Sequence, residues 1–358
     1  MTTVWCAAEP LETFVRETCC ALGTPEDIAA EVAHHLVRAN LSGHDSHGVL
    51  RLPWYASQIK NGELIPQARP TIVRETAGTA LFDSGFGFGH YATRVVLDWT
   101  LARAKQQGVA SAAIRNFTHI GRLGEYAEHG AEQGLVTLVT IGTAGHDNGW
   151  VAPFGGRGRF LGTNPWAIGV PAAGRLPMVY DAATSTIAEG KVRQAQAKGL
   201  PLPPGCILDR HGAPSDVPGD LYDGGMLLPL GGSVAGHKGY GFALAAALLG
   251  GLAMSADGAR DPDDPAMQNI SGVLVLVLDP AAFGSAAHFA ERAGAVLDAA
   301  TRVEPVPGVE RVLVPGEPEA QARSERHRTG IPIPEPVWRE LEQLAAQVEV
   351  ELPEHRVE

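Results

Sequence analysis

Residues 79–90 read TALFDSGFGFGH, a short apolar run followed by three glycines at alternating positions. Thr79–Asp83 has the composition of a strand and Tyr91–Gln107 that of a helix, so the glycines lie in the turn between them. This order invites comparison with the G-x-G-x-x-G motif of dinucleotide-binding folds. The comparison fails, because His90 stands where the third glycine belongs and no acidic residue ends a strand about 20 residues later. The stretch is interpreted as a flexible turn, and it does not support a Rossmann unit.

Strands and helices continue to alternate downstream of this turn. Four short apolar runs are predicted strands: Val109–Ile114, Leu135–Ile141, Met178–Asp181 and Val273–Leu278. Three longer segments between them are predicted helices: Gly121–Gln133, Thr186–Lys198 and Tyr240–Met254. The stretch 199–232 is rich in Gly and Pro and is expected to be largely loop. The pattern predicts an α/β fold with a mixed sheet.

Both ends of the chain have helical patterns. Near the N-terminus, Asp45-Ser46 is a suitable cap for a helix that runs to about Gly62 and carries Val49 and Trp54. The last predicted helix, Pro336–Val348, has its apolar residues on one face.

Composition limits the class of protein. The 358 residues are 45% hydrophobic, which is enough for one large domain or two. Acidic residues outnumber basic ones by 40 to 28, and no basic stripe points to nucleic-acid binding. Four cysteines without a C-x-x-C pair are typical of reduced thiols, and no secretory signal precedes them, so a cytoplasmic protein is expected. The longest apolar run falls short of the roughly 20 residues that cross a membrane.

The segment 43–51, GHDSHGVLR, carries the richest group of reactive side chains. In a helix that starts at Ser46, His47 and Arg51 are four residues apart and share a face. An arginine can clamp a carboxylate with two hydrogen bonds, and a histidine can exchange a proton with a carbonyl oxygen near neutral pH. Two alternatives stay open at this point: a solvated helix start, or a metal site that uses His44 and His47.

A second candidate lies in segment 116–124, NFTHIGRLG, between a predicted strand and a predicted helix. Loops at strand ends often carry a catalytic group, so His119 is an alternative acid/base residue, and a buried structural histidine is the competing interpretation. Three further turns join small residues to one polar side chain, and each is a weak signal: Thr163-Asn164-Pro165, Asp181-Ala182-Ala183-Thr184-Ser185 and Gly236-His237-Lys238-Gly239-Tyr240-Gly241.

In order along the chain, these segments resemble the malate/L-lactate dehydrogenase family of the non-Rossmann type, which includes ureidoglycolate and sulfolactate dehydrogenases and piperideine-carboxylate reductases. The resemblance covers nearly the whole chain and rests on seven motifs: Ser46-His47-Gly48-Val49-x-Arg51, His119-Ile120-Gly121-x-x-Gly124, Val151-Ala152-Pro153-Phe154-Gly155-Gly156, Gly162-Thr163-Asn164-Pro165, Asp181-Ala182-Ala183-Thr184-Ser185, Lys238-Gly239-Tyr240-Gly241 and Pro315-Gly316-Glu317.

The resemblance implies an enzyme that transfers hydride between NAD or NADP and a small 2-keto acid, 2-hydroxy acid or cyclic imino acid. It implies a homodimer with active sites near the subunit interface, and a family-specific mixed sheet that binds the cofactor without a Rossmann unit. By position, His47 and His119 are the acid/base pair and Arg51 holds the substrate carboxylate. The residues expected to line the cofactor are Asp147, Thr163, Asn164, Asp181, Ala182, Ala183, Lys238, Gly316 and Glu317.

The same resemblance implies three parts of the chain: helical residues 1–75, a cofactor-binding domain over 76–300, and a segment 301–358 that packs with the N-terminal helices. The sequence departs from the family pattern at His146–Trp150, and an acidic segment, 255–265, contains Arg260. Two other classes of protein are retained as alternatives. One is a metal-dependent hydrolase or lyase that uses His44, His47 and His119, and the other is a non-catalytic relative that binds cofactor.

Overall fold

The computed structural model describes residues 2–145, 149–255 and 269–357. Its centre is a seven-stranded sheet in the order β2-β3-β4-β11-β5-β6-β7. The strands are β2 (Thr71–Glu75), β3 (Thr79–Asp83), β4 (Val109–Arg115), β5 (Val136–Ala144), β6 (Trp166–Val170), β7 (Met178–Ala182) and β11 (Ile270–Leu278). Only β3 and β4 pair in parallel, so the sheet is mixed as the sequence predicts.

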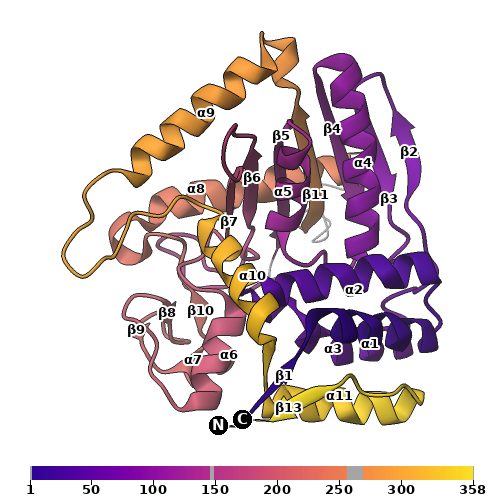
Figure 1. Cartoon of the computed structure of the whole chain (residues 1–358). Coiled ribbons are helices and arrows are strands. Elements are labelled where there is room, and N and C mark those ends of the chain that lie inside the picture. Colours follow the sequence, from indigo (N-terminus) through magenta and orange to yellow (C-terminus); the bar gives the residue numbers. More distant parts are fainter. Residues whose placement is uncertain (1, 146–148, 256–268, 358) are drawn as a thin grey trace.

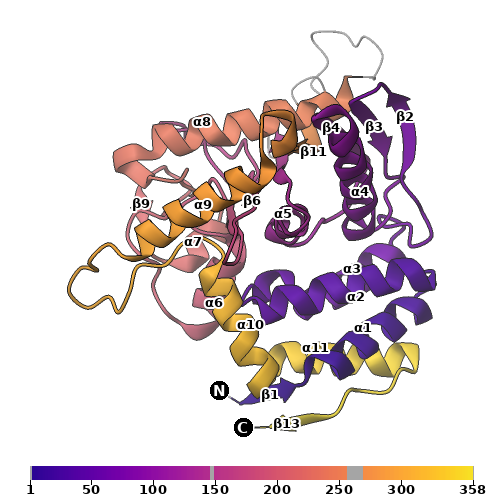
Figure 2. The same ribbon diagram turned by 45° about the horizontal axis from the view of Figure 1, so that its top comes forward.

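Helices cover both faces of this sheet (Figures 1 and 2). On one face lie α4 (Gly89–Gln107) and α5 (Leu123–Glu132), and α4 forms the crossover between the two parallel strands. On the other face α8 (Gly232–Gly250) packs on β5 and β11 and continues into η3 (Gly251–Met254). In the described residues, no helix is long and apolar enough to cross a membrane.

The two chain ends build a second layer next to α4. It contains α1 (Ala8–Ala21), α2 (Glu26–Leu41), η1 (Asp45–His47), η2 (Val49–Arg51), α3 (Leu52–Lys60), α11 (Glu335–Val348) and a small sheet of β12 (Ile331–Pro334), β1 (Thr3–Cys6) and β13 (His355–Val357). Buried Phe14 and Leu36 from the N-terminal part share one apolar core with Trp338 and Leu341 from the C-terminal part. The two termini accordingly lie close together (Figure 1).

Most of the remaining elements lie toward the β7 edge of the sheet. They are α6 (Glu189–Lys198), β8 (Ile207–Leu208), β9 (Pro214–Ser215), α7 (Pro218–Tyr222), β10 (Met226–Leu227), α9 (Ala286–Thr301) and α10 (Glu317–Thr329). The short turn η5 (Pro280–Ala282) instead follows β11 and lies next to Gly108 at the end of α4. The stretch 199–232, expected to be largely loop, therefore contains three very short strands and one short helix. Helix α9 buries only Gly294 and projects from the body of the molecule (Figure 1).

Two predicted helices differ from the structure. The helix expected from Asp45 to Gly62 is interrupted, with the short turns η1 and η2 preceding α3. Helix α8 begins at Gly232, eight residues earlier than the apolar pattern indicated. Its first two turns are poor in helix-forming residues, but Gly236 and Gly239 are buried there, so tertiary packing overrides local propensity.

Candidate active site

The interruption between η1 and η2 comes from the close packing of Gly48 against α2. Gly48 has an extended backbone conformation, and a Cβ at this position would overlap the side chain of Asn40. Asn40 Oδ1 accepts a hydrogen bond of 2.9 Å from the amide of Val49, and Asn40 Nδ2 donates to Asp45 at 2.7 Å. Asn40 therefore fixes the backbone on both sides of His47.

His47 and Arg51 consequently do not share one face of an α-helix, which corrects the expected geometry. His47 lies in η1, and its Nδ1 is 2.9 Å from Ser46 Oγ. Arg51 ends η2, and its Nε donates to the carbonyl oxygen of Ser46 at 2.7 Å. The two side chains are held together through Ser46 instead, and the guanidinium of Arg51 lies 5.6 Å from the centre of the Trp54 ring.

His119 approaches His47 from the loop between β4 and α5. The two imidazoles are stacked, with ring centres 5.6 Å apart and an interplanar angle of 22°. The loop is pressed against the start of α4, where the amide of Gly89 donates to Thr118 Oγ1. A Cβ at Gly89 would overlap the carbonyl oxygens of residues 118 and 119. The glycine-rich turn thus permits the close approach that places His119 in the site.

Electrostatics keep this pair neutral. Both rings are partly accessible to solvent, but most of each ring is surrounded by protein. Burial, followed by the charge of Arg51, lowers the pKa of His47 to about 3. The pKa of His119 also lies well below its usual value, first because of burial and then because of His47. At neutral pH two neutral imidazoles therefore lie beside a guanidinium.

Most residues expected to line a cofactor gather around β7. Asp181 and Ala182 end this strand, and Ala183 follows them. Thr163 is adjacent, since its carbonyl oxygen accepts from the amide of Thr184 at 2.8 Å. Asn164 is buried, and its side chain is engaged with the backbone of Thr143 and Ala243.

Of the other four expected cofactor residues, the structure describes Gly316, Glu317 and Lys238. Gly316 precedes α10 next to β7, where Pro315 accepts a backbone hydrogen bond from Val179 at 3.1 Å. The carboxylate of Glu317 accepts from Arg175 at 2.6 Å, so it is already paired. Lys238 is exposed within α8 rather than before it, one turn ahead of Phe242, whose carbonyl oxygen accepts from Trp166.

Some positions singled out in the sequence lie outside the described residues, namely Asp147, the stretch 146–148 and Arg260. Trp150 is described: its ring lies 4.4 Å from the guanidinium of Arg159 and 5.9 Å from the ring of Tyr222. Trp150 thus packs in the segment that contains α7.

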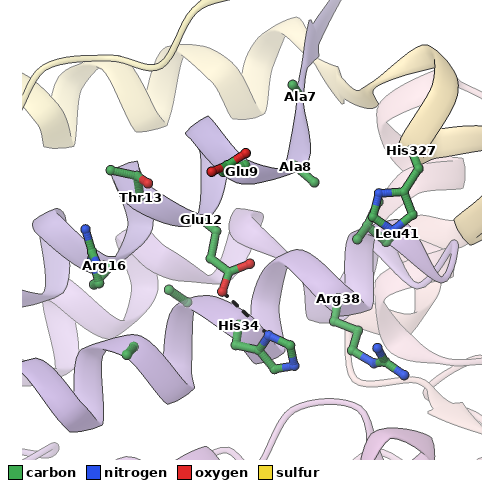
Figure 3. A pocket seen from close by; sticks show the side chains of 12 residues that line it. Ala7, Ala8, Glu9, Glu12, Thr13, Arg16, His34, Arg38, Leu41 and His327 are labelled. Atoms are coloured by element: carbon green, nitrogen blue, oxygen red, sulfur yellow. Dashed lines mark ion pairs between the residues drawn. The ribbon is translucent and has the colours of Figure 1, made fainter.

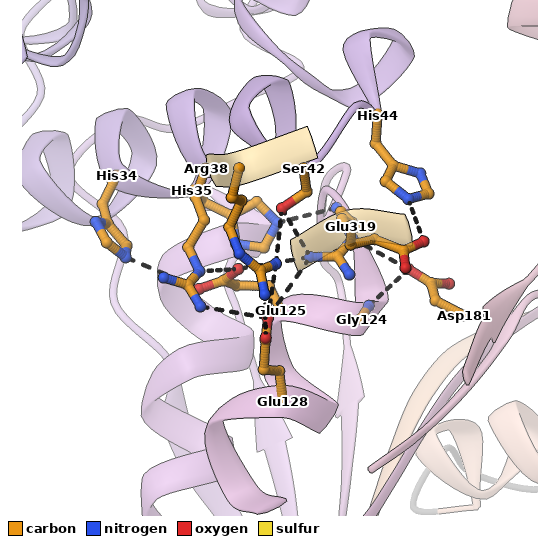
Figure 4. Close-up of polar contacts among 12 residues, drawn as sticks. His34, His35, Arg38, Ser42, His44, Gly124, Glu125, Glu128, Asp181 and Glu319 are labelled. Atoms are coloured by element: carbon orange, nitrogen blue, oxygen red, sulfur yellow. Dashed lines mark hydrogen bonds and ion pairs between the residues drawn. The ribbon is translucent and has the colours of Figure 1, made fainter. Parts of the chain in front are cut away.

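An ionic network lies between the segment that precedes His47 and the end of β7 (Figure 4). Arg122, only 3% exposed, precedes α5 and lies 3.8 Å from the carboxylate of Asp181. The amide of Gly124 donates to the same carboxylate at 2.7 Å. Burial raises the pKa of Asp181, and the charge of Arg122 opposes that rise.

The same network reaches α2 and α10. Glu128 of α5 binds Arg323 at 2.6 Å and Arg38 at 3.3 Å. Helix α10 also holds the segment before His47, because Arg326 binds Asp45 at 2.6 Å and Glu319 lies 3.1 Å from His44. The helix that begins at the expected cofactor residues is therefore tied to the η1 turn.

A separate cleft lies between α1, α2 and the end of α10. It has a volume of about 650 Å³, and its lining includes Glu12, His34 and Arg38 but none of the expected site residues (Figure 3). His34 and His35 are adjacent on α2 and face different surroundings: His34 pairs with Glu12 in the cleft, while His35 contacts Tyr126. In the part of the chain that the structure describes, no group of three or more metal-binding side chains occurs.

Two residues of the site escaped the sequence analysis. Tyr55 is 1% exposed, and its hydroxyl lies 2.7 Å from His119 Nδ1 and 3.3 Å from His90 Nε2. His90 is fully buried at the start of α4. The sequence contained a signal for each of them. Tyr55 lies four residues after Arg51, and His90 occupies the position of the third glycine in the G-x-G-x-x-G comparison. Only the fold shows that they meet at His119.

Comparison with known proteins supplies the family context. The family model described as malate/L-lactate dehydrogenase matches residues 6–342. The chain is 32% identical to hydroxycarboxylate dehydrogenase B of Escherichia coli O157:H7, with 95% of this chain and 93% of that protein covered. It is 36% identical to an L-lactate dehydrogenase of Cupriavidus necator, covering 95% and 97%. The crystal structure of malate dehydrogenase from Entamoeba histolytica superposes with a TM-score of 0.90 at 26% identity, covering 98% and 100%.

Proposed function

The chain belongs to the malate/L-lactate dehydrogenase family, and from this premise we propose that His119, His47 and Arg51 form its active site. Family membership makes the protein an oxidoreductase that transfers hydride between a nicotinamide cofactor and a small 2-hydroxy, 2-keto or cyclic imino acid. The observation that carries the assignment is the stacked pair of histidines beside one arginine. Nothing in the comparisons favours a metal-dependent hydrolase.

Arg51 is the residue that orients the substrate in this proposal. Its Nε is occupied by the carbonyl oxygen of Ser46, which fixes the guanidinium and leaves its two terminal nitrogens for a carboxylate. Holding the carboxylate at one place sets the position of the adjacent carbon and removes several kcal/mol from the barrier. When bound, the nicotinamide supplies or accepts the hydride at that carbon.

The histidine pair handles the proton. In oxidation of a hydroxy acid, a neutral imidazole is the form required to accept the hydroxyl proton, and burial favours that form. The charge of Arg51 is one of the causes that lower the pKa values of His47 and His119. In reduction, the carboxylate of the bound substrate offsets this charge. Substrate binding therefore raises the proton affinity of both rings, which prepares one of them to protonate the carbonyl oxygen.

We assign the cofactor to the β7 edge. The donor set suits an anionic dinucleotide, because Lys238 carries an exposed positive charge and α8 begins without a side-chain cap. The amide of Gly232 donates to Pro229, so the exposed Ser233 and Val234 supply the amides that can meet a phosphate. Ala182 and Ala183 are partly accessible, and the absence of a side chain at Gly316 allows its close approach to Val179 of β7. We propose that Asp181, Thr163 and Glu317 also line the cofactor site. Asn164 acts there by shaping the backbone, because its side chain is already engaged.

A homodimer is part of the proposal and rests on the surface of α8. This helix is largely apolar, and Val234 is 88%, Phe242 60% and Leu248 63% exposed on it. An apolar helix face of this kind is typical of a protein interface. Light scattering of the wild type and of Phe242→Asp tests the assignment. We expect a dimer that the substitution weakens, and a monomeric wild type would refute it.

The test of function is oxidation of NADH and NADPH by 2-keto acids and cyclic imino acids, followed by the loss of nicotinamide absorbance. Pyruvate, oxaloacetate, sulfopyruvate and piperideine-2-carboxylate form a suitable panel. Turnover of any member defines the substrate group and the preferred cofactor in one experiment. Cofactor binding without turnover of any member would instead favour the non-catalytic alternative.

A further inference from the structure

Tyr55 lies between two histidines that differ in accessibility. Its ring packs edge-on against Phe88 and His90, with ring centres 5.9 Å and 5.5 Å away. Its hydroxyl reaches outward to Nδ1 of the partly accessible His119 and inward to Nε2 of the buried His90. The three polar groups form one short chain from the active site into the protein.

The hydrogen-bonding capacity of a phenol limits how this chain is arranged. A tyrosine hydroxyl has one proton to donate and can accept others, and each neutral imidazole carries one N–H. If Tyr55 donates to His119 Nδ1, it accepts from His90, and His119 presents an N–H at Nε2. If His119 Nδ1 donates to Tyr55, the hydroxyl donates to His90, and His119 presents a lone pair at Nε2.

We propose that Tyr55, itself held by His90, is a positioning residue that fixes the ring of His119 and reserves Nε2 for the substrate. The inference rests on the proposed acid/base role of His119. In oxidation, the neutral ring of His119 donates its Nδ1 proton in the hydrogen bond to Tyr55, so the lone pair at Nε2 can take the hydroxyl proton of the substrate. In reduction, the protonated ring keeps the same Nδ1 hydrogen bond and gives its Nε2 proton to the carbonyl oxygen. In both directions Tyr55 donates to His90, so neither Tyr55 nor His90 gains or loses a proton.

The surroundings of His119 support a neutral chain. The charged or titratable groups that face it come from several elements: His35 (α2), His47 (η1), Arg51 (η2), Tyr55 (α3) and His90 (α4). Burial, followed by His47, His90 and Arg51, lowers the pKa of His119, and burial lowers the pKa of His90 to about 3. A neutral hydroxyl is thus the partner that suits Nδ1 of His119, because it can serve either tautomer.

The presence of an imidazole at position 90 also needs an explanation. His90 is completely buried, and its Nδ1 has no hydrogen-bond partner among the described residues. Burying an unsatisfied polar atom opposes folding, and an aromatic hydrocarbon ring would fill similar space without that cost. The hydrogen bond from Nε2 to Tyr55 is the feature that an apolar ring cannot replace.

The first experiment is Tyr55→Phe, which keeps the ring and removes the hydroxyl. We expect kcat to fall about 10- to 100-fold, because a mispositioned acid/base group costs about that much. KM for the keto acid and binding of NADH, measured by fluorescence, should stay close to wild type, since Tyr55 touches neither Arg51 nor the β7 edge in this proposal.

Tyr126→Phe is the matched control. Tyr126 is also buried, and its hydroxyl donates at 2.6 Å to the carbonyl oxygen of Ile120, in the same loop as His119. Its loss removes this hydrogen bond and a longer one of 3.5 Å to the backbone carbonyl oxygen of His90, but none from the side chain of His119 or His90. A kcat that falls as far in Tyr126→Phe as in Tyr55→Phe would overturn the proposal, because the effect would then be a general loosening of the loop.

Variants of His90 separate a polar role from a packing role. His90→Gln retains a group able to bind the hydroxyl, and His90→Phe does not. We expect His90→Gln to keep at least about ten times the kcat of His90→Phe. The double variant Tyr55→Phe/His90→Phe should be no slower than Tyr55→Phe alone, because both changes break the same chain. Equal rates for the two His90 variants would contradict the proposal.

His119→Asn distinguishes the failure of this inference from the failure of the proposed function. If His119→Asn is inactive and Tyr55→Phe is fully active, His119 works without the tyrosine and only the inference fails. If His119→Asn retains wild-type turnover, the proposed acid/base assignment fails, and the role of Tyr55 falls with it.

Discussion

Two clusters of ionisable side chains meet at the start of α5, and they offset the free-energy cost of burial in different ways. The histidine cluster comprises His35, His47, His90 and His119 together with Tyr55. The ionic network comprises Arg38, Arg122, Arg323, Glu125 and Glu128 (Figure 4). They join where the amide of Arg122 donates to His35 Nε2 at 2.9 Å.

The histidines are neutral, so they avoid the free-energy cost of burying a charge. The side chains of the ionic network stay charged, and each charge is paired with an opposite one. Burial lowers the pKa of each of the four histidines. In the network, each buried carboxylate faces at least two guanidinium groups. A group that must exchange protons benefits from the first solution, and a group that must hold helices together benefits from the second.

The largest effect is expected for His119→Asn, which should lower kcat about 10²- to 10⁴-fold, the usual contribution of a general acid or base. The free energy of unfolding should change little, because the ring is partly accessible. Steady-state kinetics and denaturant unfolding on the same preparation measure both quantities. A large loss of stability with normal kcat would reverse the roles assigned to the two clusters.

Glu128→Ala should have the opposite effect, a loss of stability with little change in kcat. Glu128 is 5% exposed and binds Arg38 of α2 and Arg323 of α10. Its removal takes from Arg323 the carboxylate that it binds at 2.6 Å, while Arg38 keeps Glu125, and it should cost about 3–5 kcal/mol of unfolding free energy. The kcat of the folded fraction should stay near wild type. Glu335→Ala, which breaks an exposed pair with Arg339, is the control and should cost less than about 1 kcal/mol. Equal losses in the two variants would show that burial does not strengthen the network.

Arg51→Lys tests whether the arginine beside the histidine cluster binds the substrate carboxylate. Lysine keeps the charge but cannot form the two-pronged contact with a carboxylate, so KM for the keto acid should rise about 10- to 100-fold. The kcat at saturation should fall less than KM rises. Binding of NADH, followed by fluorescence, serves as the control and should not change. A variant with wild-type KM would remove Arg51 from the substrate site.

The smallest effect concerns the dependence of stability on pH. The folded-state pKa of His90 is about 3, against an unfolded value of about 6.5, so the unfolded chain binds the extra proton between these values. The contribution of His90 is fully present above about pH 6.5. It is lost on acidification toward pH 3, by about 1.4 kcal/mol for each pH unit.

Urea unfolding at pH 6.5 and pH 5 compares wild type with His90→Gln. The wild type should lose more free energy of unfolding over this interval, by up to about 2 kcal/mol, because glutamine does not titrate. Identical losses in the two proteins would show that His90 is not held neutral in the folded state.

Much of the fold followed from local patterns. The predicted strands match β3, β4, β5, β7 and β11, and the long helices match α4, α5 and α11 to within a few residues. Short strands such as β1 and β13 were missed, since a few residues carry too little periodicity. The division at residues 75 and 300 stays a prediction, although both chain ends share one apolar core.

By itself, the sequence identified which residue types are available for chemistry: Ser46-His47-Gly48 with Arg51, and the His119 loop. Residue identity and short spacings are local properties, so they can be recognised from the sequence alone. The tertiary structure alone decided that His47 stacks on His119, that Gly48 breaks a helix because Asn40 fills its space, and that Tyr55 reaches both His90 and His119. These contacts join segments far apart in the chain, and the pKa values follow from the burial that such packing creates.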